Sequence, residues 1–154
     1  MRKVFFILLC FFWAMPSGFA QLKIHSFEEA EKLSRENPKP IVAFIHTSWC
    51  KYCKMMENSS FKNADIITSL NTSFYFVSLD AESKNDIAFN NHIFKYKPTG
   101  QNTGIHELAI QLGTIENQIN YPVLCILNDK NEIIFQYNNF LSPADFKIIL
   151  DKFL

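Results

Sequence analysis

The sequence predicts an α/β domain in which a mixed central sheet is flanked by helices. Two observations indicate this fold class. Short, continuous apolar runs, typical of strands buried on both faces, alternate with segments whose apolar residues recur at helical spacing. Behind a first helix, these segments follow in the order strand–helix–strand–helix–strand–strand–helix. Because the chain shows no repeat, linker or low-complexity stretch, we expect residues 21–154 to form one domain.

Residues 1–20 have the order of a secretory signal peptide. Arg2 and Lys3 precede the apolar run 4–15, which ends shortly before Ala20. About 12 apolar residues are fewer than the roughly 20 that a membrane-spanning helix needs. We therefore expect cleavage after Ala20 and a periplasmic or secreted mature protein, with a membrane anchor as the alternative.

The charge balance gives no support for a nucleic-acid partner. The chain has 15 basic and 15 acidic residues, and loss of Arg2 and Lys3 leaves 13 against 15, a net charge of −2. No basic run occurs. The mature chain would keep Cys50, Cys53 and Cys125, an odd number that does not fit a disulfide scaffold. The cysteines therefore indicate chemistry rather than structural cross-linking.

The first elements are predicted by their end signals. Ser26, followed three residues later by a glutamate, is typical of a capping box, and the helix behind it should end before Pro38. The apolar run 41–45 is expected to be a central strand buried on both faces. After a turn, a helix should begin near Cys50 and run towards Phe61.

The middle of the chain is less regular. Its apolar spacing and turn residues predict a helix, a second buried strand, a hairpin around an Asn-rich turn and a helix closed by a glycine. These four elements are expected over residues 64–70, 74–79, 87–96 and 104–112, with Gly113 closing the last.

The last third of the chain has the clearest signals. A third strand is expected over 123–127, followed by a turn and a fourth strand over 132–137. Ser142 should cap the final helix, because Pro143 suits its first position and Leu141 is placed to contact Phe146 as a hydrophobic staple.

The motif that decides the chemistry is Trp49-Cys50-Lys51-Tyr52-Cys53-Lys54. Two cysteines three residues apart at a helix start lie about one turn from each other, close enough for a disulfide. Unpaired backbone N–H groups and the helix dipole stabilise a thiolate at Cys50, which can attack a disulfide. Cys53, one turn deeper, would resolve the mixed disulfide.

A metal site is the alternative interpretation of this motif. One Cys-x-x-Cys pair is half of a zinc site, but the sequence lacks a second ligand pair. We therefore expect no metal and no bound cofactor at Cys50 and Cys53. A non-catalytic module that holds a peptide or a soft metal ion such as Cu(I) stays open as the second hypothesis.

Taken together, these motifs resemble the thioredoxin superfamily over roughly residues 26–154. The shared features are the strand 41–45, the Trp49-Cys50-x-x-Cys53 helix start, and Tyr121-Pro122 before the strand 123–127. The resemblance implies a thioredoxin-like fold and a cis Pro122 that faces the reactive pair and holds an extended substrate segment. We interpret Trp49 as a half-exposed lid or as core, and Tyr121 as a groove residue or as packing.

A narrower likeness lies around Cys53 and the residues that follow it. This segment is similar to secreted thioredoxin-like proteins related to the C-terminal domain of DsbD, which implies a protein kept reduced that passes electrons to periplasmic disulfides. Phe44 stands where many thioredoxins have a buried Asp, and Lys51-Tyr52 replaces their Gly-Pro. Glu57 can share a helix face with Cys53, either as a substitute proton acceptor or as a solvated residue.

The sequence therefore predicts a thiol–disulfide oxidoreductase that acts on protein disulfides outside the cytoplasm, in the reducing direction. Its expected partners are disulfide-containing substrate proteins and a protein electron donor, such as a membrane thiol reductant. We expect a monomer that binds no nucleic acid. Cys125 is interpreted as an inert buried thiol, and the four histidines as surface or loop residues.

Overall fold

The structure, a computed structural model, describes residues 21–154, and the expected signal peptide lies outside that range. Its centre is a four-stranded sheet in the order β2-β1-β7-β8. The strands are β1 (Ile41–His46), β2 (Tyr75–Asp80), β7 (Val123–Leu127) and β8 (Ile133–Tyr137). Strand β1 runs parallel to β2 and antiparallel to β7, and β7 is antiparallel to β8. The predicted mixed sheet is confirmed.

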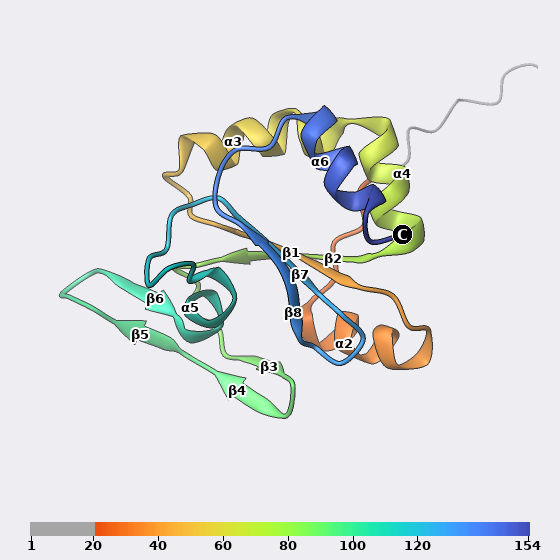
Figure 1. Cartoon of the computed structure of the whole chain (residues 1–154). Coiled ribbons are helices and arrows are strands. Elements are labelled where there is room, and N and C mark those ends of the chain that lie inside the picture. The colour runs from red at the N-terminus through yellow and green to blue at the C-terminus, as the bar shows by residue number, and fades with distance from the viewer. Residues whose placement is uncertain (1–20) are drawn as a thin grey trace, which may run out of the picture.

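Helices cover both faces of this sheet (Figure 1). On one face lie α3 (Lys51–Asn58), α4 (Ala64–Ser73) and α6 (Pro143–Asp151), with the short 3-10 helix Ser60–Lys62 between α3 and α4. On the other face lie α2 (Phe27–Glu36) and α5 (Glu107–Gly113). Within residues 21–154, the structure contains no helix with the length and apolar character needed to cross a membrane.

The two faces have separate hydrophobic cores, because side chains alternate along each strand. From β1, Val42 and Phe44 pack in the core beneath α3, α4 and α6. Ile41 and Ile45 pack in the core beneath α2 and α5. All of these side chains are at most 1% exposed, as expected of a central strand covered on both sides.

The helix signals at the two ends of the chain are confirmed. The Ser26 side chain accepts a hydrogen bond from the Glu29 N–H (3.1 Å), and that of Ser142 accepts one from the Asp145 N–H (3.2 Å). Leu141 and its staple partner in α6 are both buried. The helix expected to run from Cys50 towards Phe61 is shorter, since α3 ends at Asn58 and Ser59 leaves helical geometry.

Two small hairpins occupy the segment between β2 and α5. The first joins β3 (Ile87–Phe89) to β4 (His92–Phe94) through Asn90 and Asn91, both at positive φ, as the sequence predicts. The second joins β5 (Tyr96–Pro98) to β6 (Gly104–His106). The prediction of a helix over 104–112 is therefore wrong for its first three residues. Gly113, expected to close this helix, is instead its last residue, and Thr114 is the C-cap. The His106 side chain caps α5 instead, accepting a hydrogen bond from the Leu108 N–H (3.2 Å).

Candidate redox site

Cys50 and Cys53 form a disulfide at the start of α3, with their Cα atoms 5.2 Å apart. Strand β1 leads into a turn in which the Cys50 N–H donates to the Thr47 carbonyl (3.3 Å), so Cys50 becomes the N-cap residue of α3. Its Sγ accepts a hydrogen bond from the Cys53 N–H (3.1 Å). Cys50 is 5% exposed and Cys53 is completely buried. Solvent and substrate therefore reach Cys50 first.

An aromatic rim lies beside the disulfide. Trp49 is 65% exposed, so it does not form part of the core. Its Nε1 donates to Glu82 Oε1 (3.1 Å), and its ring lies edge-on to Tyr121 with centroids 6.0 Å apart. Tyr121 is half-buried, and burial together with the nearby carboxylates of Glu82 and Asp80 raises its pKa to about 12. Tyr121 is therefore an uncharged wall next to the indole.

The peptide bond between Tyr121 and Pro122 is cis, the isomer that the resemblance implies. Pro122 leads directly into β7, whose first residue, Val123, pairs with Ile45. This register places Pro122 at the end of β1 from which the chain turns towards Cys50. The structure thus brings Trp49, Tyr121 and Pro122 to the same edge of the sheet as the disulfide.

Two large exposed side chains of α3 were not singled out as site residues by the sequence analysis. Tyr52 is 56% exposed and Met55 is 49% exposed. Tyr52 and Met55 are three residues apart on α3, so they lie on one surface of the helix, and Trp49 precedes its N-cap residue. That spacing is the signal that would have identified them.

Beneath the cysteines the core is apolar where many thioredoxins place an acid. Phe44 is 1% exposed and belongs to the same core cluster as both cysteines. Its ring meets Phe61 edge-on (4.7 Å between centroids) and is stacked on the imidazole of His46 (5.2 Å, planes 19° apart). Direct proton acceptance at position 44 is therefore impossible.

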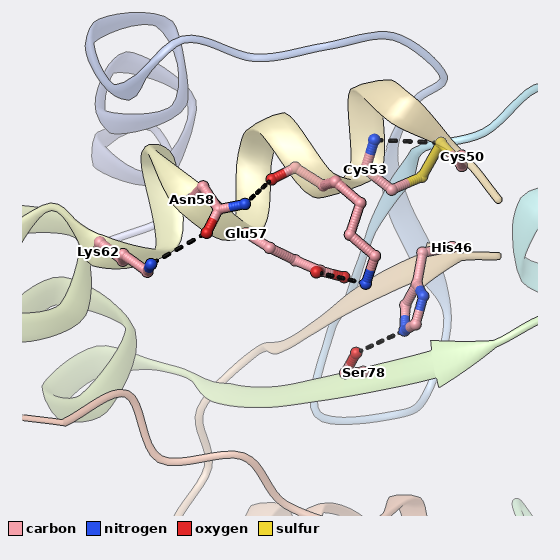
Figure 2. Close-up of polar contacts among 8 residues, drawn as sticks. His46, Cys50, Cys53, Glu57, Asn58, Lys62 and Ser78 are labelled. Atoms are coloured by element: carbon pink, nitrogen blue, oxygen red, sulfur yellow. Dashed lines mark hydrogen bonds and ion pairs between the residues drawn. A yellow bond between two sulfur atoms is a disulfide. The ribbon is translucent and has the colours of Figure 1, made fainter. Parts of the chain in front are cut away.

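The candidate acceptor Glu57 lies on α3 and forms an ion pair with Lys54, Nζ to Oε2 2.8 Å. The Glu57 side chain is 31% exposed and the Lys54 side chain 52%. Figure 2 shows the Glu57 side chain beneath α3, on the side of β1 on which His46 lies. The structure therefore holds the Glu57 carboxylate under the redox helix instead of leaving it free in solvent.

The interpretation of the histidines as surface or loop residues is wrong for His25 and His106, which are 7% and 0% exposed. His46 is half-buried at the end of β1, with Nε2 3.0 Å from Ser78 Oγ (Figure 2). Its Nδ1 is buried and has no hydrogen-bond partner among residues 21–154. Burial lowers the pKa of His46, although the carboxylates of Asp80 and Glu57 oppose that shift.

Cys125 lies on the opposite face of the sheet from the disulfide. It is completely buried in the core beneath α2 and α5 and is unbonded. Burial raises the pKa of its thiol to about 12. Both observations agree with the expected inert thiol, because the sheet separates Cys125 from Cys50 and Cys53 and the thiolate is scarce.

Comparison with known proteins places this geometry in a family. A family model described as Thioredox_DsbH, "Protein of unknown function, DUF255", matches residues 23–143. The chain belongs to this family. The description of this family names no activity. Membership therefore shows that the chain is thioredoxin-like but does not show which reaction it catalyses.

Solved structures support the same fold. A structure titled "DsbH Oxidoreductase" superposes with a TM-score of 0.64 and 21% identity, covering 90% of this chain and 88% of that one. A thioredoxin from Thermus thermophilus superposes with a TM-score of 0.62 and 18% identity, covering 86% of each chain. At these identities the likeness shows the thioredoxin-like fold alone.

Curated relatives match only a short segment. Spermatogenesis-associated protein 20 of Mus musculus is 40% identical over 60 residues, and the Homo sapiens protein of that name is 37% identical over 60 residues. The match covers 39% of this chain and 8% of each relative. The chain therefore resembles one small part of these much longer proteins.

Proposed function

We propose that this chain is a thiol–disulfide oxidoreductase that reduces protein disulfides outside the cytoplasm. The observation that carries the proposal is the asymmetry of the Cys50–Cys53 disulfide. Cys50 is the accessible N-cap residue of α3, and Cys53 is buried one turn behind it. A thiolate at the N-cap position is stabilised by backbone N–H groups, whereas a buried second thiol is protected until a mixed disulfide brings it into use.

The proposed cycle is dithiol–disulfide exchange. The Cys50 thiolate attacks one sulfur of a substrate disulfide, and the other substrate sulfur leaves as a thiolate that takes up a proton. Cys53 then loses its proton and attacks Cys50 Sγ, which releases the second substrate thiol and forms the intramolecular disulfide. A donor protein with a reactive dithiol, for which we propose a membrane thiol reductant, returns two electrons and restores both cysteines.

The surface beside the disulfide is the proposed substrate site. Trp49 and Tyr121 provide an aromatic wall, and Pro122 lies at the sheet edge next to it. Glu57 is the proposed proton acceptor during resolution. The reducing direction is supported by the likeness of the residues after Cys53 to the secreted relatives of the DsbD C-terminal domain.

Trapping of mixed disulfides tests the proposed cycle. Cys53→Ala should accumulate disulfides between Cys50 and substrate proteins, because the resolving thiol is missing, and Cys50→Ala should accumulate none. Cys125→Ala is the matched control and should turn over a generic protein disulfide with excess dithiol like the unaltered chain. Equal trapping by both single variants would overturn the assignment. Absence of turnover in the unaltered chain would support the peptide-binding or metal-binding module instead.

Export is tested separately. We propose that residues 1–20 are removed on secretion, which supports action in the periplasm or outside the cell. Mass spectrometry of the exported protein should find Gln21 at the N-terminus. An intact Met1 on a membrane-bound product would identify residues 4–15 as an anchor.

A further inference from the structure

His46 lies on the side of β1 that carries Phe44 and faces the redox helix. Figure 2 shows its side chain leaving the strand below the Cys50–Cys53 disulfide, with the imidazole turned towards Ser78. Val42, Phe44 and position 46 alternate along β1, so His46 is the next side chain on this face in the direction of the cysteines. His46 is therefore the polar side chain of β1, and it stands at the end of the strand that leads to the redox pair.

The hydrogen bonding of His46 is incomplete. When Nε2 donates to Ser78 Oγ, the buried Nδ1 has no hydrogen-bond partner of good geometry among the described residues, and the adjacent Thr47 backbone favours the protonated ring. A buried polar atom without a partner costs free energy and calls for an explanation. An Nδ1 that accepts a proton in another state of the site is such an explanation.

The charges around His46 favour a positive imidazolium. Asp80 is its register partner on the neighbouring strand β2, and α3 contributes Glu57 and Lys54. On the β7 side, Tyr121 and Pro122 carry no charge at neutral pH. Two carboxylates thus face one ammonium group. In the disulfide form, burial still outweighs these carboxylates and keeps the ring neutral.

We propose that His46 takes up one of the two protons that accompany reduction of the Cys50–Cys53 disulfide. This inference rests on the proposed function. A donor dithiol gives two electrons and two protons and becomes a disulfide. One proton binds Cys53 Sγ and the other binds His46 Nδ1, which leaves Cys50 as a thiolate and the site without a change in net charge.

The two protons leave again during substrate reduction. The substrate disulfide is cleaved, the protons of Cys53 and His46 end on the two substrate sulfurs, and the intramolecular disulfide returns with a neutral imidazole. Ser78 is exposed and, with Glu57 and Phe44, lines a cavity of about 790 Å³ that neither cysteine lines. This cavity lies on the Ser78 side of the imidazole.

Titration of the histidine side chains by nuclear magnetic resonance tests the inference on the unaltered protein. The midpoint of the His46 titration should be higher in the reduced protein than in the oxidised one, because the Cys50 thiolate favours imidazolium. The Cys50→Ala variant, which has no disulfide, is the control, and its His46 midpoint should not change when reductant is added. An identical His46 midpoint in both states would overturn the inference.

Variants separate proton uptake from a structural role. His46→Gln keeps a side-chain donor for Ser78 but does not titrate, so the reduction potential plotted against pH should lose the inflection due to His46. Ser78→Ala keeps the imidazole and should retain an inflection at a shifted pH. If His46→Gln retains the inflection of the unaltered chain, His46 is only structural. A shifted His46 midpoint in a protein without turnover would contradict the proposed function and not the proton uptake.

Discussion

At the scale of single residues, burial distinguishes the three cysteines of residues 21–154. Cys50 is slightly exposed at a helix N-cap, Cys53 is buried on the same face of the sheet, and Cys125 is buried on the other face. The reactivity of a thiol follows both its thiolate fraction and its access to solvent. Three chemically identical side chains should therefore react in a fixed order.

Alkylation measures that order. After reduction at pH 8, iodoacetamide should modify Cys50 first and leave Cys125 unmodified. Burial raises the pKa of Cys125 to about 12, which leaves roughly one molecule in ten thousand as thiolate at pH 8. Peptide mapping by mass spectrometry identifies the modified cysteines, and unfolding in guanidinium should make all three react. Rapid labelling of Cys125 in the folded protein would contradict its inert role.

Glu57 gives a second prediction at this scale. Glu57→Gln preserves the shape of the side chain and a hydrogen-bonding group beneath α3 but removes the base. General base catalysis contributes typically 10²–10⁴-fold, so we expect Cys53 to resolve a mixed disulfide at least about tenfold more slowly, with attack by Cys50 unchanged. Stopped-flow measurement of the two steps separates them.

The matched control for Glu57 is its ion-pair partner. Lys54→Gln removes the ammonium group 2.8 Å from the carboxylate while keeping the base. This variant should slow resolution far less than Glu57→Gln. Equal slowing by both substitutions would mean that the rate of resolution depends on the ion pair and not on proton acceptance by Glu57.

At the scale of elements, local signals predicted the helices and strands wherever their ends carry capping or turn residues. Helices α2 and α6 begin at Ser26 and Ser142 as expected, and the Asn90–Asn91 turn forms its hairpin. The prediction failed at Gly104, because β6 exists only through its pairing with β5. The pairing of two three-residue strands is not indicated by the residues of either strand alone. A histidine such as His106 is also not one of the usual N-cap residues.

The β5–β6 hairpin explains why the first residue of β6 is a glycine. A Cβ atom on Gly104 would lie 2.4 Å from the Tyr96 ring and 2.5 Å from the Lys97 carbonyl oxygen. The carbonyl belongs to the backbone and cannot rotate away. Gly104→Ala should therefore lower the free energy of unfolding by about 1–3 kcal/mol, measured by urea denaturation.

A second glycine in the same hairpin is the control. A Cβ atom on Gly100 would meet only the Thr103 hydroxyl at 2.7 Å, and that side chain can change its rotamer. Gly100→Ala should therefore change stability little. A loss at Gly100 equal to that at Gly104 would show that the close approach to Lys97 does not decide the effect.

At the scale of the whole molecule, the sheet joins segments that are far apart in the sequence into one site. The cysteine pair and its helix were predictable because both are encoded within six neighbouring residues. The environment of His46 was not, since Ser78 and Asp80 reach it only through the parallel pairing of β1 with β2. Trp49 meets Tyr121 in the same way, across the turn and the start of β7.

The reduction potential measures the free-energy difference between the oxidised and reduced forms of the whole folded molecule. Lysines near Cys50 stabilise the thiolate and raise the potential. Lys54 is paired with Glu57, whereas Lys51 has no ion-pair partner among residues 21–154. An exposed charge contributes under about 1 kcal/mol, and 1.4 kcal/mol corresponds to about 30 mV for two electrons.

One such lysine therefore cannot move a thioredoxin-like pair to the potential of DsbA, roughly 150 mV higher. We expect the Cys50–Cys53 pair to lie within about 50 mV of the thioredoxin value of roughly −270 mV, measured by equilibrium with glutathione. Lys51→Gln should lower the potential by no more than about 20 mV. A value near the roughly −120 mV of DsbA would make the protein an oxidant and reverse the proposed direction of electron flow, with the same two cysteines performing the exchange.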